Sequence, residues 1–161
     1  MSAHVFCQSV SRALKKSRDI VSAMIAPPFR FPTNSAIEFI AIRLGLRNDP
    51  HMQDWAIEVA EASDIPRYLA LFQDAGINEE VRFALAEMTI QAFEDWTYEA
   101  RNPDLNSNPE WAWFLSYLAE NAKVHEWQIW YWAGWDNSLD DTWQVAPYMR
   151  RLYQGYLAAS A

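Results

Sequence analysis

The sequence predicts an all-α protein, and three of its features lead to that prediction. Apolar and polar residues alternate for no more than a few positions, only four glycines occur among the 161 residues, and valine and isoleucine form no strand-length runs. Short helical segments joined by tight polar links favour a single domain of stacked, solenoid-like helical hairpins. Because no internal repeat supports such a stack, an irregular helical bundle is the alternative.

Length and composition indicate one packed domain. The chain has a mass of 18.7 kDa, and 51% of its residues are apolar and 15% aromatic, which is far more than a disordered segment carries. Its single cysteine, Cys7, has no partner for an internal disulfide. A reducing, cytoplasmic compartment is therefore the expected location.

Charge divides the chain into two parts. Residues 1–33 form a basic N-terminal arm with five basic residues and one acidic residue, whereas residues 34–161 hold 8 basic and 20 acidic residues and form the helical domain. An apolar face between Ser9 and Ala26 predicts one short helix in the arm. No stretch approaches the ~20 apolar residues that span a membrane.

The acidic sign of residues 34–161 limits the classes of partner that the domain can bind. A surface of this sign repels phosphate groups and anionic lipids. Nucleic acid and membranes are therefore not expected as partners, whereas a protein with a basic contact surface is. The oligomeric state does not follow from these features.

Helix-capping patterns define the first helices of the domain. Ser35 and Glu38 have the spacing of a capping box and predict a helix over about 35–44, which Gly45 ends. The segment 51–62 predicts a second helix, and its acidic residues form a solvated line along it.

The next two predicted helices are a short one and a long one. The short helix has Pro66 in its first turn, and Asn78 caps the long helix, which runs to about Tyr98. Apolar residues cover most of the long helix, which predicts that it packs on several sides. Its remaining stripe is narrow and polar, and it consists of Glu80, Glu87, Gln91 and Glu94.

The stretch 109–135 holds six of the nine tryptophans and is the expected core of the domain. Asn108, followed by a proline, has the pattern of a helix start, and the stretch is predicted to form one helix or two that meet near Asn121. A final helix is predicted to begin near Pro147. The aromatic cluster at 127–135 is either core or interface.

No set of residues has the pattern of a catalytic or cofactor site. His125 and Glu126 begin like the HExxH zinc motif, but Ile129 stands where the second histidine is required. His51 and Asp54 lie one helical turn apart and would form a metal site only if His125 joined them. A hydrogen-bonded, partly buried His125 is the favoured interpretation, so no enzymatic activity, metal or cofactor is expected.

Three segments carry a resemblance to a known group of proteins. They are RFALAEMTIQAFED at 82–95, the HxxxIxYW pattern from His125 to Trp132, and the DNSLDDTWQVAPYMRRLY that follows. In acidic and aromatic pattern, residues 35–153 resemble the small acidic immunity (antitoxin-like) proteins of bacterial polymorphic or contact-dependent toxin systems. The resemblance implies a cytoplasmic, mostly helical, non-enzymatic protein that binds and neutralises a toxin. It assigns no active residues, and the basic arm departs from it.

A partner-binding surface is expected on the second half of the central stretch. If the helix is regular from Lys123 onward, Trp130 shares a polar stripe with Glu126 and is hard to bury. An exposed tryptophan among carboxylates is a common interface anchor. An adaptor or scaffold for an endogenous protein is the alternative function, and a metal-dependent enzyme using His51 and His125 is a further one. The predicted partner-binding residues are Glu126, Trp127, Trp130, Asp136, Asp140 and Asp141.

Overall fold

The structure is a computed structural model that describes residues 25–100 and 104–160, and every regular element in them is helical. No β-strand occurs in this part of the chain, so the all-α prediction is confirmed. Cys7 and nearly all of the short helix expected in the basic arm lie outside the described residues. The helices are α2 (Asn34–Leu44), α3 (Trp55–Val59), α4 (Ile65–Phe72), α5 (Glu79–Glu99), α6 (Pro109–Glu120), α7 (Glu126–Trp132) and α8 (Ala146–Ser160), with 3-10 turns η1 (Ala62–Asp64), η2 (Leu105–Ser107) and η3 (Leu139–Asp141).

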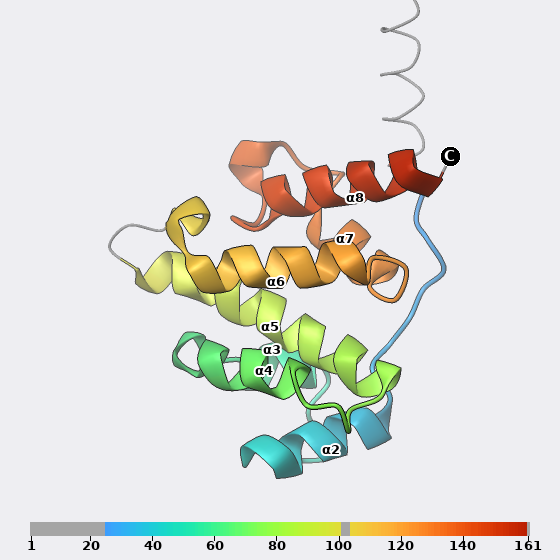
Figure 1. Ribbon diagram of the computed structural model, residues 1–161. Helices are drawn as coiled ribbons and strands as arrows, with labels where there is room; N and C mark the ends of the chain where they lie inside the picture. The colour runs from blue at the N-terminus through green and yellow to red at the C-terminus, as the bar shows by residue number, and fades with distance from the viewer. Residues whose placement is uncertain (1–24, 101–103, 161) are drawn as a thin grey trace, which may run out of the picture.

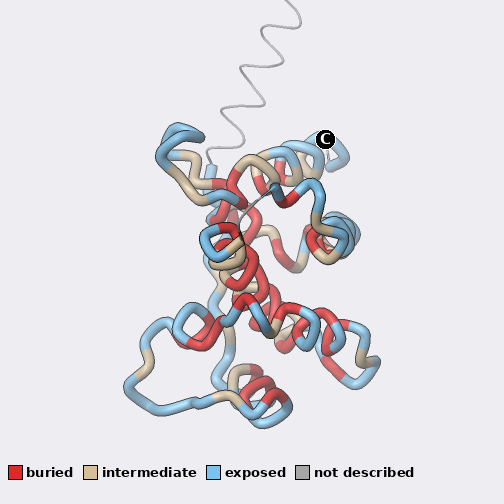
Figure 2. Tube along the Cα trace, turned by 90° about the vertical axis from the view of Figure 1, so that its left-hand side faces the viewer, coloured by how far each residue is buried: buried red, intermediate tan, exposed pale blue. Residues whose placement is uncertain are grey.

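The long helix α5 lies in the middle of the molecule, with other helices on both sides (Figure 1). It contacts α2, α3, α4 and η1 on one side, and the ring of Phe93 packs against Trp111 of α6 with centroids 4.9 Å apart. α7 and α8 pack against each other, and α7 also contacts α5 directly through hydrogen bonds from Gln128 and Trp132. Buried residues run through the centre of the tube in Figure 2. The packing of α5 on several sides follows from its broad apolar coverage, as predicted.

Most helix ends lie where the capping residues predict them. The Asn78 side chain accepts a hydrogen bond from the Val81 N–H at the start of α5. At the start of α6, the Asn108 side chain accepts hydrogen bonds from the N–H groups of Glu110 and Trp111. Gly45 ends α2 with a φ of 66°, a left-handed conformation that favours glycine. α6 ends at Glu120 and α7 begins at Glu126, so the central stretch forms two helices that meet near Asn121.

The first helix begins earlier than its predicted cap. Thr33, not Ser35, is the N-cap of α2, and its hydroxyl accepts a hydrogen bond from the Ala36 N–H at 3.3 Å. Pro32 holds the preceding chain extended, so the first hydroxyl that follows it takes the capping position. Glu38 is exposed on the helix and has no part in the cap.

The second helix is shorter than predicted. Of the segment 51–62, only Trp55–Val59 is α-helical. The Glu58 carboxylate accepts hydrogen bonds from the backbone N–H groups of Gln53 and Asp54 and folds back on the start of the helix. Glu58 nevertheless stays exposed, as do Asp54 and Glu61, so the acidic line is solvated as predicted. After Val59 the backbone turns extended at Ala60, with ψ at 136°.

Three glutamates of the polar stripe on α5, spaced seven residues apart, contact other parts of the chain. We call Glu80, Glu87 and Glu94 the glutamate line. Arg30 donates a hydrogen bond of 2.6 Å to Oε1 of Glu80, and the indole N–H of Trp132 on α7 donates one of 3.0 Å to Oε1 of Glu87. The stripe that marks the polar side of α5 in the sequence therefore contacts both the N-terminal segment and α7.

Glu94 is the most deeply buried member of the glutamate line. Its side chain is enclosed, with 3% of the residue exposed, and its two carboxylate oxygens accept hydrogen bonds from the backbone N–H groups of Gln144 and Val145, each 3.0 Å long. These two residues directly precede α8. Glu94 thus satisfies the free N–H groups at the start of α8 and places a negative charge at the positive end of that helix.

Replacing Glu94 is expected to destabilise the protein because it leaves the buried Val145 N–H and the partly buried Gln144 N–H without acceptors. Glu94→Ala should lower the free energy of unfolding by about 3 kcal/mol, and Glu94→Gln, which keeps one acceptor, by roughly half as much. Urea unfolding measures both. Glu99→Ala removes an exposed carboxylate from the last turn of the same helix and is the matched control. Equal stability of the Glu94→Ala and Glu99→Ala proteins would contradict the capping role.

Candidate functional site

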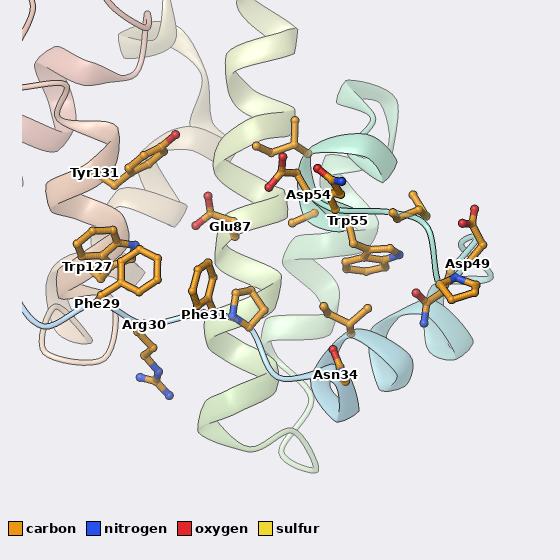
Figure 3. Close-up of a pocket in the computed structure, with 18 residues that line it drawn as sticks. Phe29, Arg30, Phe31, Asn34, Asp49, Asp54, Trp55, Glu87, Trp127 and Tyr131 are labelled. Carbon is orange, nitrogen blue, oxygen red and sulfur yellow. The ribbon is translucent and has the colours of Figure 1, made fainter.

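A pocket of about 770 Å³ lies between the extended segment 25–33 and helices α3, α5 and α7 (Figure 3). Aromatic rings and carboxylates dominate its lining. The rings come from the extended segment, from α3 and from α7, and the carboxylates come from the loop before α3, the start of α3 and the middle of α5. These lining residues are Phe29, Phe31, Trp55, Trp127 and Tyr131, together with Asp49, Asp54 and Glu87.

Arg30 fixes the wall of the pocket that residues 25–33 form. Its guanidinium donates hydrogen bonds to Glu79, Glu80 and the backbone oxygen of Val124, at 3.1, 2.6 and 3.2 Å. The same group lies 4.4 Å from the centre of the Phe83 ring, a cation–π contact. The described end of the basic arm therefore packs against the acidic domain, whereas the division of the chain at residue 33 stays a prediction.

The aromatic rings of the pocket form a continuous series. The Phe31 and Phe29 centroids are 4.1 Å apart, Phe29 lies 4.4 Å from Trp127, and Trp127 lies 6.4 Å from Tyr131. Phe29 and Phe31 are 57% and 68% exposed. Exposed rings of this size at the mouth of a pocket are typical of a binding site.

Two carboxylates, the half-buried Glu87 and the exposed Asp54, face the same part of the pocket. Figure 3 shows Glu87 of α5 and Asp54 of the α3 cap beside each other, facing the same space. Burial raises the pKa of Glu87, and the charge of Asp54 acts in the same direction, against hydrogen bonds from Trp132 and Gln128. Burial also raises the pKa of Tyr131, and both carboxylates add to the effect. The pocket thus has a negative interior within an aromatic rim.

The structure places only part of the predicted partner-binding set in this pocket. Trp127 lines it. Trp130 is half-buried, packs against the hydrophobic core and has its ring 5.3 Å from Trp127, so it is not the exposed anchor that the helical stripe predicts. α7 begins only at Glu126, so Lys123 lies in the preceding turn and, of the assumed stripe, only Glu126 shares a helical face with Trp130.

The remaining predicted residues lie at either end of α7. Glu126 is half-exposed in the first turn of the helix. Asp136, Asp140 and Asp141 are exposed in the segment between α7 and α8, the last two within η3. None of these four carboxylates lines the pocket.

Sequence reasoning missed most of the pocket. Phe29 and Phe31 belong to a segment without helical periodicity, and Tyr131 is exposed on α7. The available signal was the alternation of rings in Phe-Arg-Phe-Pro directly before the helix start, which is typical of an extended segment with one apolar side. No local signal brings Asp54 and Glu87 together, because 33 positions of chain separate them.

His125 is a buried, hydrogen-bonded histidine, as predicted. It is fully enclosed, its Nδ1 lies 2.8 Å from Oε1 of Gln128, and its Nε2 lies 3.3 Å from the Tyr117 hydroxyl. Burial lowers the pKa of His125 to about 4, although the Gln128 hydrogen bond opposes the shift. Gln128 in turn donates to the Phe83 backbone oxygen at 2.7 Å, so this group of side chains attaches α7 to α5.

The structure does not join His51 to His125. His51 is exposed in the loop before α3, whereas protein groups occupy both ring nitrogens of His125. Within residues 25–100 and 104–160, no three histidine, cysteine, aspartate or glutamate side chains are grouped so that they could hold a metal ion.

Comparisons with protein-family models, curated proteins and solved structures found no match to the chain. The resemblance to immunity proteins therefore stays a prediction. No helix in the described part of the chain combines the length and apolar character that crossing a membrane requires.

The lowered pKa of His125 predicts a specific dependence of stability on pH. Since the unfolded chain takes up the proton near pH 6.5 and the folded chain only near pH 4, the stability is full above pH 6.5 and falls as the pH drops toward 4. Between pH 7 and pH 5 the loss should be about 2 kcal/mol, measured by urea unfolding. His125→Gln should lack this part of the pH dependence, whereas His51→Gln, at an exposed site, should keep it. An unchanged slope in His125→Gln would contradict the burial of a neutral imidazole.

Proposed function

We propose that the protein is a non-enzymatic binding protein of the immunity type, which binds and neutralises a cognate protein toxin in the cytoplasm. The observation that carries this proposal is the pocket whose exposed rings surround two carboxylates on an acidic protein of net charge −8. Its shape and chemistry suit a basic protein surface. The resemblance in acidic and aromatic pattern adds support from the sequence.

The exposed rings supply the anchors that a tight protein complex needs. Binding energy in such complexes concentrates in a few aromatic residues that lose contact with water. Phe29, Phe31 and Trp127 form one contacting group, and Arg30 holds the segment that carries the first two in place. Because the three rings are held in place before binding, they would lose little conformational entropy when a partner binds.

The charge of the protein suits fast capture of a basic partner. Three carboxylates are exposed to water beyond the C-terminal end of α7: Asp136, Asp140 and Asp141. Clustered exposed charges of one sign mainly raise the rate of association with an oppositely charged protein. A toxin that acts on nucleic acid commonly has a basic cleft, and an acidic protein that enters the cleft would block it.

Genomic position and growth provide the first test of this proposal. The gene of an immunity protein is expected directly downstream of a gene for a large secreted toxin. Expression of that toxin should stop growth, and co-expression of this chain should restore it. Failure of co-expression to protect cells, or the absence of such a neighbour, would count against the proposal. Capture of an endogenous protein that is not a toxin would favour the adaptor function instead.

Trp127 is the residue whose removal should weaken toxin binding most clearly. Trp127→Ala is expected to raise the dissociation constant of the complex about thirty-fold or more, because the ring lines the pocket. Surface plasmon resonance measures the constant. The ring also packs against Phe29 and Trp130, so urea unfolding measures the accompanying change in stability. Trp113→Ala removes another partly exposed tryptophan, 38% exposed on α6, and is the matched control. Equal affinities of the two variants would place the toxin surface elsewhere.

A further inference from the structure

No basic side chain of the described residues forms an ion pair with the pocket carboxylates Asp49, Asp54 or Glu87. Arg30 is the one basic residue among the described residues that line the pocket, and its guanidinium is engaged by Glu79 and Glu80. Figure 3 shows this side chain pointing away from Glu87 and Asp54. The interior of the pocket therefore carries negative charge that the lining does not balance.

Among the pocket carboxylates, Glu87 is the one whose charge a bound cation would stabilise most. It is half-buried on α5, where water stabilises its charge less than at the surface. Its described hydrogen-bond partners, Trp132 and Gln128, are uncharged, and Asp54 adds a second negative charge nearby. A cation that enters the pocket would relieve both the desolvation of Glu87 and the repulsion between the two carboxylates.

The rings of the pocket select among cations. Trp127, Tyr131 and Phe31 lie around the same space, and aromatic faces attract cations within about 6 Å. A hydrated metal ion gains little from such walls. An organic cation with a flat, weakly hydrated surface gains from both the rings and the carboxylates.

We propose that this pocket binds a guanidinium group, presented by an arginine side chain of the partner protein. The planar group stacks on the rings at the rim, and its several N–H groups donate to the carboxylates of Glu87 and Asp54 together. The volume of about 770 Å³ leaves room for the side chain and the backbone next to it. The inference rests on the proposed function, since it names the chemistry by which a basic partner engages the pocket.

Titration of the full-length chain with methylguanidinium chloride tests the pocket without any toxin. The Trp127 indole and Tyr131 ring signals in nuclear magnetic resonance spectra should shift and saturate, with a dissociation constant on the order of 1 mM. Sodium chloride at equal ionic strength is the control for screening. Methylammonium, which has the same charge but no planar face, should bind more weakly, and equal or tighter binding would overturn the choice of guanidinium.

Two variants link the binding to the carboxylate. Glu87→Gln keeps the size of the side chain and an oxygen that accepts from Trp132, and it should weaken methylguanidinium binding about tenfold. Glu38→Gln removes an exposed charge from α2 and should bind like wild type. Circular dichroism and urea unfolding establish that both are folded. Should the Glu87→Gln spectrum show loss of fold, Asp54→Asn, at an exposed position, takes its place with the same expected direction.

A second arm of the titration identifies the source of the guanidinium. A capped Gly-Arg-Gly peptide should shift the same signals at least as strongly as methylguanidinium. If the free cation binds and the peptide does not, the pocket takes a small molecule, and the partner's arginine is ruled out. If neither binds, the pocket assignment is wrong, while protection against a toxin could still establish the immunity function. Conversely, binding of both probes without any protection would reject the immunity function and keep the guanidinium site.

Discussion

The enclosure of α5 is the constraint on which the rest of the structure depends. A helix with neighbours on several sides cannot bury ionised side chains without partners, because an uncompensated buried charge is costly. The glutamate line meets this constraint with hydrogen bonds from three separate places: Arg30, Trp132 of α7 and the backbone that begins α8. The same carboxylates that make one side of α5 polar therefore fix where the outer elements pack on it.

Glu87 differs from the other two glutamates of the line, and the proposed guanidinium site rests on this difference. Glu80 meets a guanidinium and Glu94 meets two backbone amides, whereas Glu87 accepts from uncharged side chains and lies near Asp54. The aromatic segment that Arg30 holds in place covers one side of the same space. One helix thus both organises the fold and places in the pocket lining a carboxylate without a basic partner among the described residues.

Local signals in the sequence predicted local structure. Asn78 and Asn108 cap helices as predicted, because a cap needs only neighbours within one turn. The sequence showed the polar stripe of α5 but not its hydrogen-bond donors, since Trp132 and the residues before α8 lie 45 or more positions away along the chain. Phe29 was missed for the same reason, and Trp130 was misplaced because residues distant in the sequence form the core against which its ring packs.

Direct measurement of the protonation of Glu87 is the sharpest test of this arrangement. Side-chain carbon signals in a nuclear magnetic resonance titration report the pKa of this one carboxyl. The structure predicts a pKa above the ordinary value of 4.5, because burial and the charge of Asp54 both disfavour ionisation. Saturation with methylguanidinium should lower it again, since a bound cation favours the charged form. A pKa at or below 4.5 that does not respond to the cation would contradict both the enclosure of Glu87 and the pocket built around it.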